Sequence, residues 1–190
     1  GNLAEGDWNK KLGEYVKKMT NASKSIPTNS NGAGLVALMS IYREMFERKN
    51  VLIQSNTMYG VKAMVPAAGC SIKGFIKCNI KSLMPSLLQV KESIEKIDRN
   101  DRKNLIILLS HIGGIINPDI YEISQLCKDE DIILLEDCAH SFGSTLNGKH
   151  SGLFGNAGVY SFYATKSIPA GEGGVVITKD EEIGDMISDF

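Results

Sequence analysis

The sequence predicts a three-layer α/β fold, in which helices cover both faces of a mostly parallel sheet. Short apolar runs alternate with helical patterns along the chain, which is the order expected of such a fold. Most of the apolar runs lack polar alternation, as is typical of strands that are buried on both faces. Hydrophobic residues make up 43% of the 190 residues, so the chain can bury a substantial core, and we expect one domain.

Six apolar runs are predicted strands: 51–54, 72–78, 105–110, 132–136, 159–162 and 175–178. Apolar residues at helical spacing predict helices over 8–19, 35–46, 87–97 and 120–127. Asn117 and Pro118 are typical of a helix start, with a capping side chain before proline. Asn147-Gly148 predicts a tight turn between short extended segments. Because ligands bind beyond the carboxyl ends of parallel strands, residues that follow the strands are the first site candidates.

Charge and cysteine usage exclude several classes of function. The net charge is -1, so no broad positive field would attract nucleic acid or an acidic membrane surface. The four cysteines have no C-x-x-C spacing and no histidine at metal-ligand spacing, which predicts reduced thiols, no metal and a cytoplasmic protein. No apolar run approaches transmembrane length, and no signal-peptide pattern opens the chain.

Three segments carry residue types suited to chemistry. Asp137 follows an apolar strand, where a carboxylate is better placed for a ligand than for packing. Ser161 and Lys166 follow another strand and precede the glycine-rich stretch 171–174. Burial of a lysine is costly, but it favours the neutral amine that attacks a carbonyl. The small residues around Gly32 open a helix, where backbone N–H groups and the helix dipole favour phosphate.

Together these segments fit pyridoxal phosphate. This cofactor needs a lysine for its Schiff base, an acid beside its pyridine nitrogen, and a phosphate cup. Lys166, Asp137, Ser161 and the helix start at Gly32 supply all three. Each signal alone has an ordinary structural explanation: a helix cap for the aspartate, a solvent-facing turn for the lysine, and an incomplete P-loop for the glycine segment.

The same segments, in the same order, resemble the DegT/StrS family of sugar aminotransferases, which have the aspartate-aminotransferase fold. The resemblance runs along nearly the whole chain and is most specific in 136–143, 161–166 and 171–174, with further matches in 30–35, 55–59 and 111–114. Ala33 stands where the family usually has threonine, and Met58 stands where it usually has an aromatic residue. Tyr59 is the alternative to Met58 for packing on the cofactor ring.

The resemblance implies a role for each matching residue. Lys166 forms the Schiff base, and Asp137 pairs with the pyridine nitrogen. His140 lies near the cofactor ring, and Thr57 and Met58 belong to the loop that covers it. Ser161 binds the phosphate through its hydroxyl. Gly32 and Ala33 contribute backbone N–H groups to the same phosphate.

The resemblance also implies a function and an assembly. The expected reaction is amino transfer from a donor such as glutamate to a keto-sugar nucleotide in cell-surface polysaccharide biosynthesis. A sugar dehydratase is a close alternative, although some of those have histidine in place of Lys166. A truncated, non-catalytic module is the third. Family members are considerably longer, so residues 1–190 are expected to be the cofactor-binding large domain without the small C-terminal domain, in a homodimer.

Overall fold

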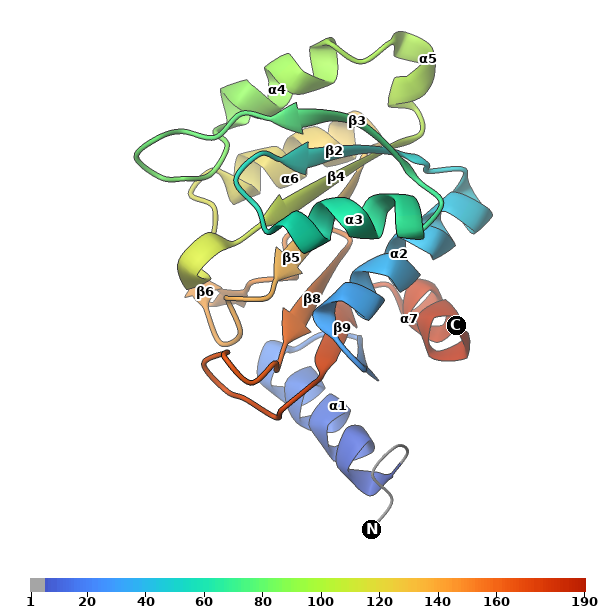
Figure 1. Ribbon diagram of the computed structural model, residues 1–190, viewed down its shortest axis with the longest axis vertical. Helices are drawn as coiled ribbons and strands as arrows, with labels where there is room; N and C mark the ends of the chain where they lie inside the picture. The colour runs from blue at the N-terminus through green and yellow to red at the C-terminus, as the bar shows by residue number, and fades with distance from the viewer. Residues whose placement is uncertain (1–5) are drawn as a thin grey trace.

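The computed structural model describes residues 6–190 and confirms the predicted three-layer α/β fold (Figure 1). Its main sheet has seven strands in the order β1-β9-β8-β5-β4-β2-β3. These strands are β1 (Lys24–Thr28), β2 (Asn50–Gln54), β3 (Ser71–Ile76), β4 (Leu105–Ser110), β5 (Ile133–Cys138), β8 (Ala157–Ser161) and β9 (Gly174–Thr178). Neighbouring strands from β3 through β8 pair in parallel, whereas β9 is antiparallel to both β8 and β1.

Helices cover both faces of this sheet. They are α1 (Asp7–Thr20), α2 (Asn31–Phe46), α3 (Tyr59–Ala67), α4 (Leu87–Glu95), α5 (Arg99–Arg102), α6 (Ile120–Asp129) and α7 (Glu181–Asp189), with a 3-10 turn, η1 (Ile112–Gly114). Helices α2, α3 and α7 pack with one face of the sheet into a single apolar cluster, and α4 and α6 pack with the other (Figure 1). Helix α1 packs against β8 and β9 in a third cluster.

All six predicted strands are present, with ends that differ by a few residues. The predicted tight turn is also present: Asn147 (φ 51°) and Gly148 (φ 77°) join β6 (Thr145–Leu146) to β7 (Lys149–His150). Both residues have the left-handed backbone that two-residue hairpin turns require. Among the described residues, no helix has both the length and the apolar character needed to cross a membrane.

The start of α6 differs from the prediction. The helix begins at Ile120, with Asp119 at the N-cap, rather than at Pro118. The side chain of Asn117 instead joins two loops, because its Oδ1 accepts from the Asp119 amide and its Nδ2 donates to the Pro85 carbonyl. The Asp119 carboxylate caps the neighbouring helix α4, because it accepts from the amide of Leu87, the first residue of that helix, at 2.8 Å. The polar residues before α6 therefore fix α4 and α6 to each other.

Candidate active site

A pocket of about 330 Å³ lies at the carboxyl ends of β4, β5 and β8, where the N-terminus of α2 meets the sheet. This is the edge at which open α/β sheets bind ligands. Seven of the eight predicted site residues line it: Gly32, Thr57, Met58, Asp137, His140, Ser161 and Lys166. Ala33 is the exception. The pocket is within the size range of small-molecule sites, which begins at roughly 300 Å³.

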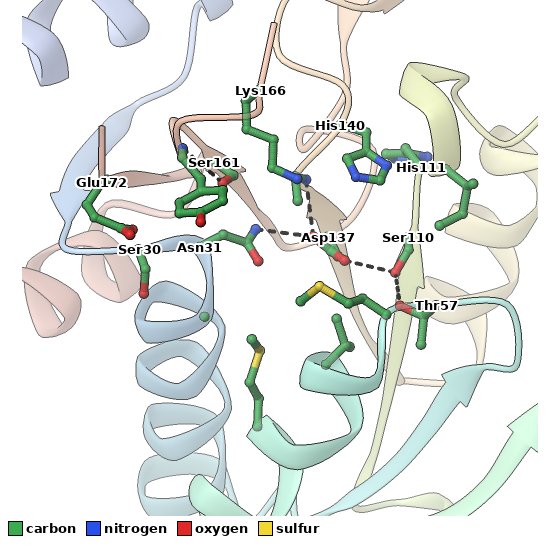
Figure 2. Close-up of a pocket in the computed structure, with 18 residues that line it drawn as sticks. Ser30, Asn31, Thr57, Ser110, His111, Asp137, His140, Ser161, Lys166 and Glu172 are labelled. Carbon is green, nitrogen blue, oxygen red and sulfur yellow. Dashed lines mark hydrogen bonds between the residues drawn. The ribbon is translucent and has the colours of Figure 1, made fainter. Parts of the chain in front are cut away.

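Asp137 lies at the centre of the pocket and is almost fully buried (Figure 2). Its Oδ1 accepts from Asn31 Nδ2 and from the Ala139 amide, both at 3.1 Å. Its Oδ2 accepts from the Ser110 hydroxyl at 2.9 Å. Ser110 is the register partner of Asp137 across the parallel pair β4–β5, so the sheet itself places the two side chains together. Neutral hydrogen-bond donors of this kind compensate the burial of the carboxylate.

The N-terminus of α2 borders the pocket. Ser30 is its N-cap, and the Ser30 hydroxyl accepts from the Ala33 amide at 3.1 Å. The Ala33 N–H that the resemblance assigns to the phosphate is thus already bound within the cap. The amides of Asn31 and Gly32 belong to the first turn, where N–H groups have no partner within the helix. The backbone amides of Asn31 and Gly32 are therefore the ones at this helix start that remain available to an anion.

Strand β9 approaches this helix start closely. A Cβ added to Gly174 would lie 2.5 Å from the Ser30 carbonyl carbon and 2.6 Å from the Asn31 nitrogen, so only glycine fits there. The glycine-rich stretch that ends at Gly174 therefore has a structural purpose. It lets β9 pack beside the first turn of α2, which brings that turn to the same pocket as β8 and Lys166.

Lys166 is half-buried and lies on the loop that follows β8. Its amide donates to the Tyr163 carbonyl at 2.9 Å, which forms a turn, and the Ala170 amide returns to the Phe162 carbonyl at 2.8 Å. Because Phe162 is buried in the core, it anchors both ends of this loop. Figure 2 shows the Lys166 side chain directed toward Asp137 in the middle of the pocket. Among the described residues that line the pocket, Lys166 is the only lysine or arginine.

The remaining predicted residues form the walls. His140 is exposed, and its Nδ1 accepts from the Gly113 amide at 3.4 Å, which leaves Nε2 as the nitrogen that can carry a proton. The side chains of Thr57 and Met58 come from the segment between β2 and α3. Met58 is 64% exposed and Tyr59 is 80% exposed, but only Met58 lines the pocket. The methionine, rather than the tyrosine, therefore faces the pocket from this segment.

A buried hydrogen-bond cluster lies beneath the pocket and was not predicted from the sequence. His111 Nε2 and Glu136 Oε2 are 2.7 Å apart, and neither side chain is exposed. His111 Nδ1 accepts from the Asn117 amide, which leaves Nε2 as the nitrogen that donates to Glu136. Glu136 also accepts from the amides of Gly152 and Gly155. Cys138 lies within 4.8 Å of this pair. The direct hydrogen bond shows that His111 and Glu136 satisfy each other, which fits a structural role better than metal binding.

All four cysteines are free, as predicted. Burial, together with the nearby Glu136 charge, raises the pKa of the Cys138 thiol well above its usual value. Burial also raises the pKa of Cys127 to about 12. A thiol held in its protonated form is a poor nucleophile, so Cys138 does not compete with Lys166 for an electrophile despite its place beside Asp137.

The chemistry of these donors fits pyridoxal phosphate. The pocket combines a primary amine, a buried carboxylate and a helix N-terminus with free amides. Asp137 Oδ1 has two donors, but Oδ2 has one, which leaves an acceptor position for a ring N–H. Ser161 adds a hydroxyl at the end of β8. A Cβ on Gly32 would lie 2.7 Å from the terminal methyl group of Met64, so a larger residue at the helix start would require that flexible side chain to move.

Comparison with known proteins agrees with this geometry. The model of the DegT/DnrJ/EryC1/StrS aminotransferase family matches residues 1–190. GDP-perosamine synthase of Escherichia coli O157:H7 is 26% identical over 98% of this chain and 50% of its own length. The structure of Helicobacter pylori PseC, described as an aminotransferase involved in pseudoaminic acid biosynthesis, superposes with a TM-score of 0.85 at 22% identity, over 98% of this chain and 48% of that one.

A solved structure with the same fold contains the predicted cofactor, and this adds to the family match. The structure of E. coli GDP-4-keto-6-deoxy-D-mannose-3-dehydratase with bound hydrated PLP superposes with a TM-score of 0.80 at 24% identity, over 96% of this chain and 46% of that one. This supports pyridoxal phosphate as the cofactor class. The chain spans about half the length of the curated relatives that it matches. The match over its whole length places this chain in the DegT/DnrJ/EryC1/StrS aminotransferase family.

Proposed function

We propose that this chain is the cofactor-binding part of a pyridoxal-phosphate enzyme that transfers an amino group to a keto-sugar nucleotide. The observation that carries the proposal is that Asp137, near the end of β5, and Lys166, on the loop after β8, line one pocket with the first turn of α2. An amine, a carboxylate and free backbone amides are the groups that this cofactor needs. The relatives' names supply the substrate class, because they act on or produce nucleotide-linked sugars.

Each residue has a role that its position supports. When bound, pyridoxal phosphate supplies an electron-withdrawing ring that stabilises negative charge beside the donor nitrogen. Asp137 Oδ2 holds a proton at the ring nitrogen, which keeps the ring electron-withdrawing. Lys166 Nζ holds the cofactor, and the freed amine can then accept and return a proton. The amides of Asn31 and Gly32 and the Ser161 hydroxyl bind the phosphate.

The residues around the ring add orientation. Met58 and His140 both line the walls of the pocket, and we expect them to contact a planar ligand there. Thr57 acts through its hydrogen bond with Ser110 rather than through the ring. We also propose that residues 1–190 form the large domain of a longer homodimeric enzyme, because the curated relatives are about twice as long as the region matched.

The dehydratase among the similar structures is the second candidate function. Removal of a sugar hydroxyl and amino transfer both begin from the same cofactor chemistry, so the pocket alone fits either. Lys166 favours amino transfer, since a freed lysine amine can both remove and return a proton. A non-catalytic module that keeps the fold is the third, and it would need neither Lys166 nor Asp137.

One experiment separates the three functions. The longer enzyme proposed above, which contains residues 1–190, is loaded with pyridoxal phosphate and incubated with glutamate and GDP-4-keto-6-deoxy-D-mannose, the sugar in the dehydratase's name. We expect 2-oxoglutarate to form together with an aminated sugar nucleotide, detected by mass spectrometry. A deoxygenated sugar without retained nitrogen would assign the dehydratase reaction instead. Neither product, with this or other nucleotide-linked keto-sugars, would indicate a non-catalytic module.

A further inference from the structure

Two hydroxyl groups connect the wall of the pocket to Asp137. Thr57 Oγ1 lies 2.8 Å from Ser110 Oγ, and Ser110 Oγ lies 2.9 Å from Asp137 Oδ2 (Figure 2). An ionised carboxylate can only accept, so the single Ser110 hydrogen is directed at Asp137. Ser110 Oγ must then accept from Thr57. The chain of hydrogen bonds therefore has one direction, from Thr57 through Ser110 to Asp137.

The position of Ser110 is fixed by its surroundings. Its side chain is 3% exposed, and its backbone lies in β4 opposite Asp137 in the parallel register. Its amide donates to Gln54 Oε1 at 3.2 Å, which ties the end of β4 to β2. The backbone of Ser110 is thus fixed by its pairing with β5 and by its bond to Gln54. Its hydroxyl can therefore set the orientation of the carboxylate that it contacts.

The carboxylate oxygens differ in how many donors they have. A carboxylate oxygen has two lone pairs, and on Oδ1 both are used, by Asn31 Nδ2 and the Ala139 amide. Oδ2 has one lone pair used by Ser110. Among the described residues Asp137 forms no ion pair, although Lys166, His140 and Glu172 line the same pocket. The direction of the free lone pair on Oδ2 therefore depends on neutral donors, chiefly Ser110.

We propose that Ser110, and Thr57 through it, are positioning residues that direct the free lone pair of Asp137 Oδ2 toward the ring nitrogen of the cofactor. The inference rests on the proposed function, since it assigns a task to Asp137 in that site. Neither hydroxyl touches the reacting atoms. The hydrogen bond between Thr57 and Ser110 also connects the segment before α3, which includes Met58, to the residues that hold the Asp137 carboxylate.

The test uses two ligands that cannot react with Lys166. One is 4'-deoxypyridoxine 5'-phosphate, which has the ring nitrogen but no aldehyde. The other is its carbocyclic analogue, in which a C–H group replaces that nitrogen. Isothermal titration calorimetry gives the dissociation constant of each ligand for the wild-type protein and for Ser110→Ala. The ratio of the two constants measures the contact between Asp137 and the ring nitrogen, without any catalytic turnover.

We expect the wild-type protein to prefer the nitrogen-containing ligand, and Ser110→Ala to lose about tenfold of that preference. A hydrogen bond to a charged group contributes roughly 1.5–3 kcal/mol, of which about 1.4 kcal/mol corresponds to a factor of ten. Thr57→Val should lower the preference less, because it removes the second bond of the chain. Thr57→Ser keeps the hydroxyl and should restore it. Ser93→Ala, on α4 and outside the pocket, is the control that should change neither constant.

Three outcomes would overturn the inference, and they differ in what they leave standing. If Ser110→Ala weakens both ligands equally, Ser110 only supports the fold of the pocket, and the proposed function survives. If the variant retains the full preference, Ser110 does not orient Asp137. If the wild-type protein binds neither ligand, the proposed cofactor site fails, and the role of Ser110 fails with it.

Discussion

At the scale of single residues, the buried carboxylate of Asp137 depends on two side chains that are distant in the chain and on one amide that is near it. Asn31, Ser110 and the Ala139 amide surround it, and they come from α2, β4 and the turn after β5. Neutral donors compensate the charge without forming an ion pair that a ligand would have to break. This arrangement keeps the carboxylate available to a positively charged ligand group.

Asp137→Asn tests that role directly. An amide cannot hold the proton of a ring nitrogen as a carboxylate does, whereas the shape of the side chain is nearly unchanged. In the longer enzyme proposed above, we expect the variant to retain bound cofactor and to slow the half-reaction with glutamate by about 100-fold or more. The rate is measured by stopped-flow absorbance. A rate close to that of the wild-type protein would show that Asp137 only caps the end of its strand.

Sequence alone could predict Asp137 and Lys166, because each follows an apolar strand at the edge where parallel sheets bind ligands. It could not predict Ser110, because a serine at the end of an apolar run is an ordinary strand end. Its contact with Asp137 follows only from the register between β4 and β5. The same holds for Asn31, whose amide reaches Asp137 across the space between α2 and the sheet. Pairings between segments far apart in the chain leave no local pattern.

At the scale of elements, the cluster of His111 and Glu136 joins β4 and β5 to the loop before β8. Glu136 accepts from His111 and from the amides of Gly152 and Gly155, so one side chain fixes three segments. It points away from Asp137, since successive side chains on a strand face opposite sides of the sheet. The residues that hold the pocket and the residues that could do the chemistry thus alternate along β5.

Glu136→Gln should therefore destabilise the fold. The amide nitrogen cannot accept from a glycine N–H, so at least one buried donor loses its partner. Leaving a buried donor without a partner costs about 1–3 kcal/mol. Urea unfolding measures the loss, with Glu122→Gln, which is exposed on α6, as the matched control. Equal unfolding midpoints for the two variants would contradict the structural role of the cluster.

Elements with an uninterrupted apolar pattern were predictable, and others were not. Strand β1 is half-buried throughout and contains Pro27, so it lacks the continuous apolar run by which buried strands are predicted. Proline is tolerated there because β1 is an edge strand of the sheet. Helix α3 contains Pro66 near its end, a residue that usually argues against a helix. Both elements are stabilised by packing on neighbours, β1 on β9 and α3 on α2, rather than by local propensity.

At the scale of the whole molecule, the fold brings one edge of the sheet and one helix N-terminus together, and it leaves apolar side chains exposed in segments that also contribute residues to the pocket. Met58, Tyr59, Ile115 and Ile168 are each more than half exposed. Exposed apolar groups that gather in one region are typical of surfaces that bind another protein or a further part of the same one. This agrees with the proposed homodimer.

Sedimentation velocity tests the proposed assembly. We expect the 190-residue chain to self-associate, and to show little or no half-reaction with glutamate when it is tested without further residues. The reason is that the curated relatives, which are about twice as long, include segments that this chain does not match. A well-behaved monomer with full activity would contradict both the dimer and the need for a further domain.

The central claim is that Lys166 holds pyridoxal phosphate, and one measurement tests it most directly. The protein is incubated with the cofactor, reduced with borohydride, digested and mapped by mass spectrometry. We predict a single modified peptide that contains Lys166, no modification in Lys166→Ala, and wild-type labelling in Lys91→Ala, whose lysine is exposed on α4. Circular dichroism should show that all three proteins are folded. A modified peptide that persists in Lys166→Ala would contradict the account.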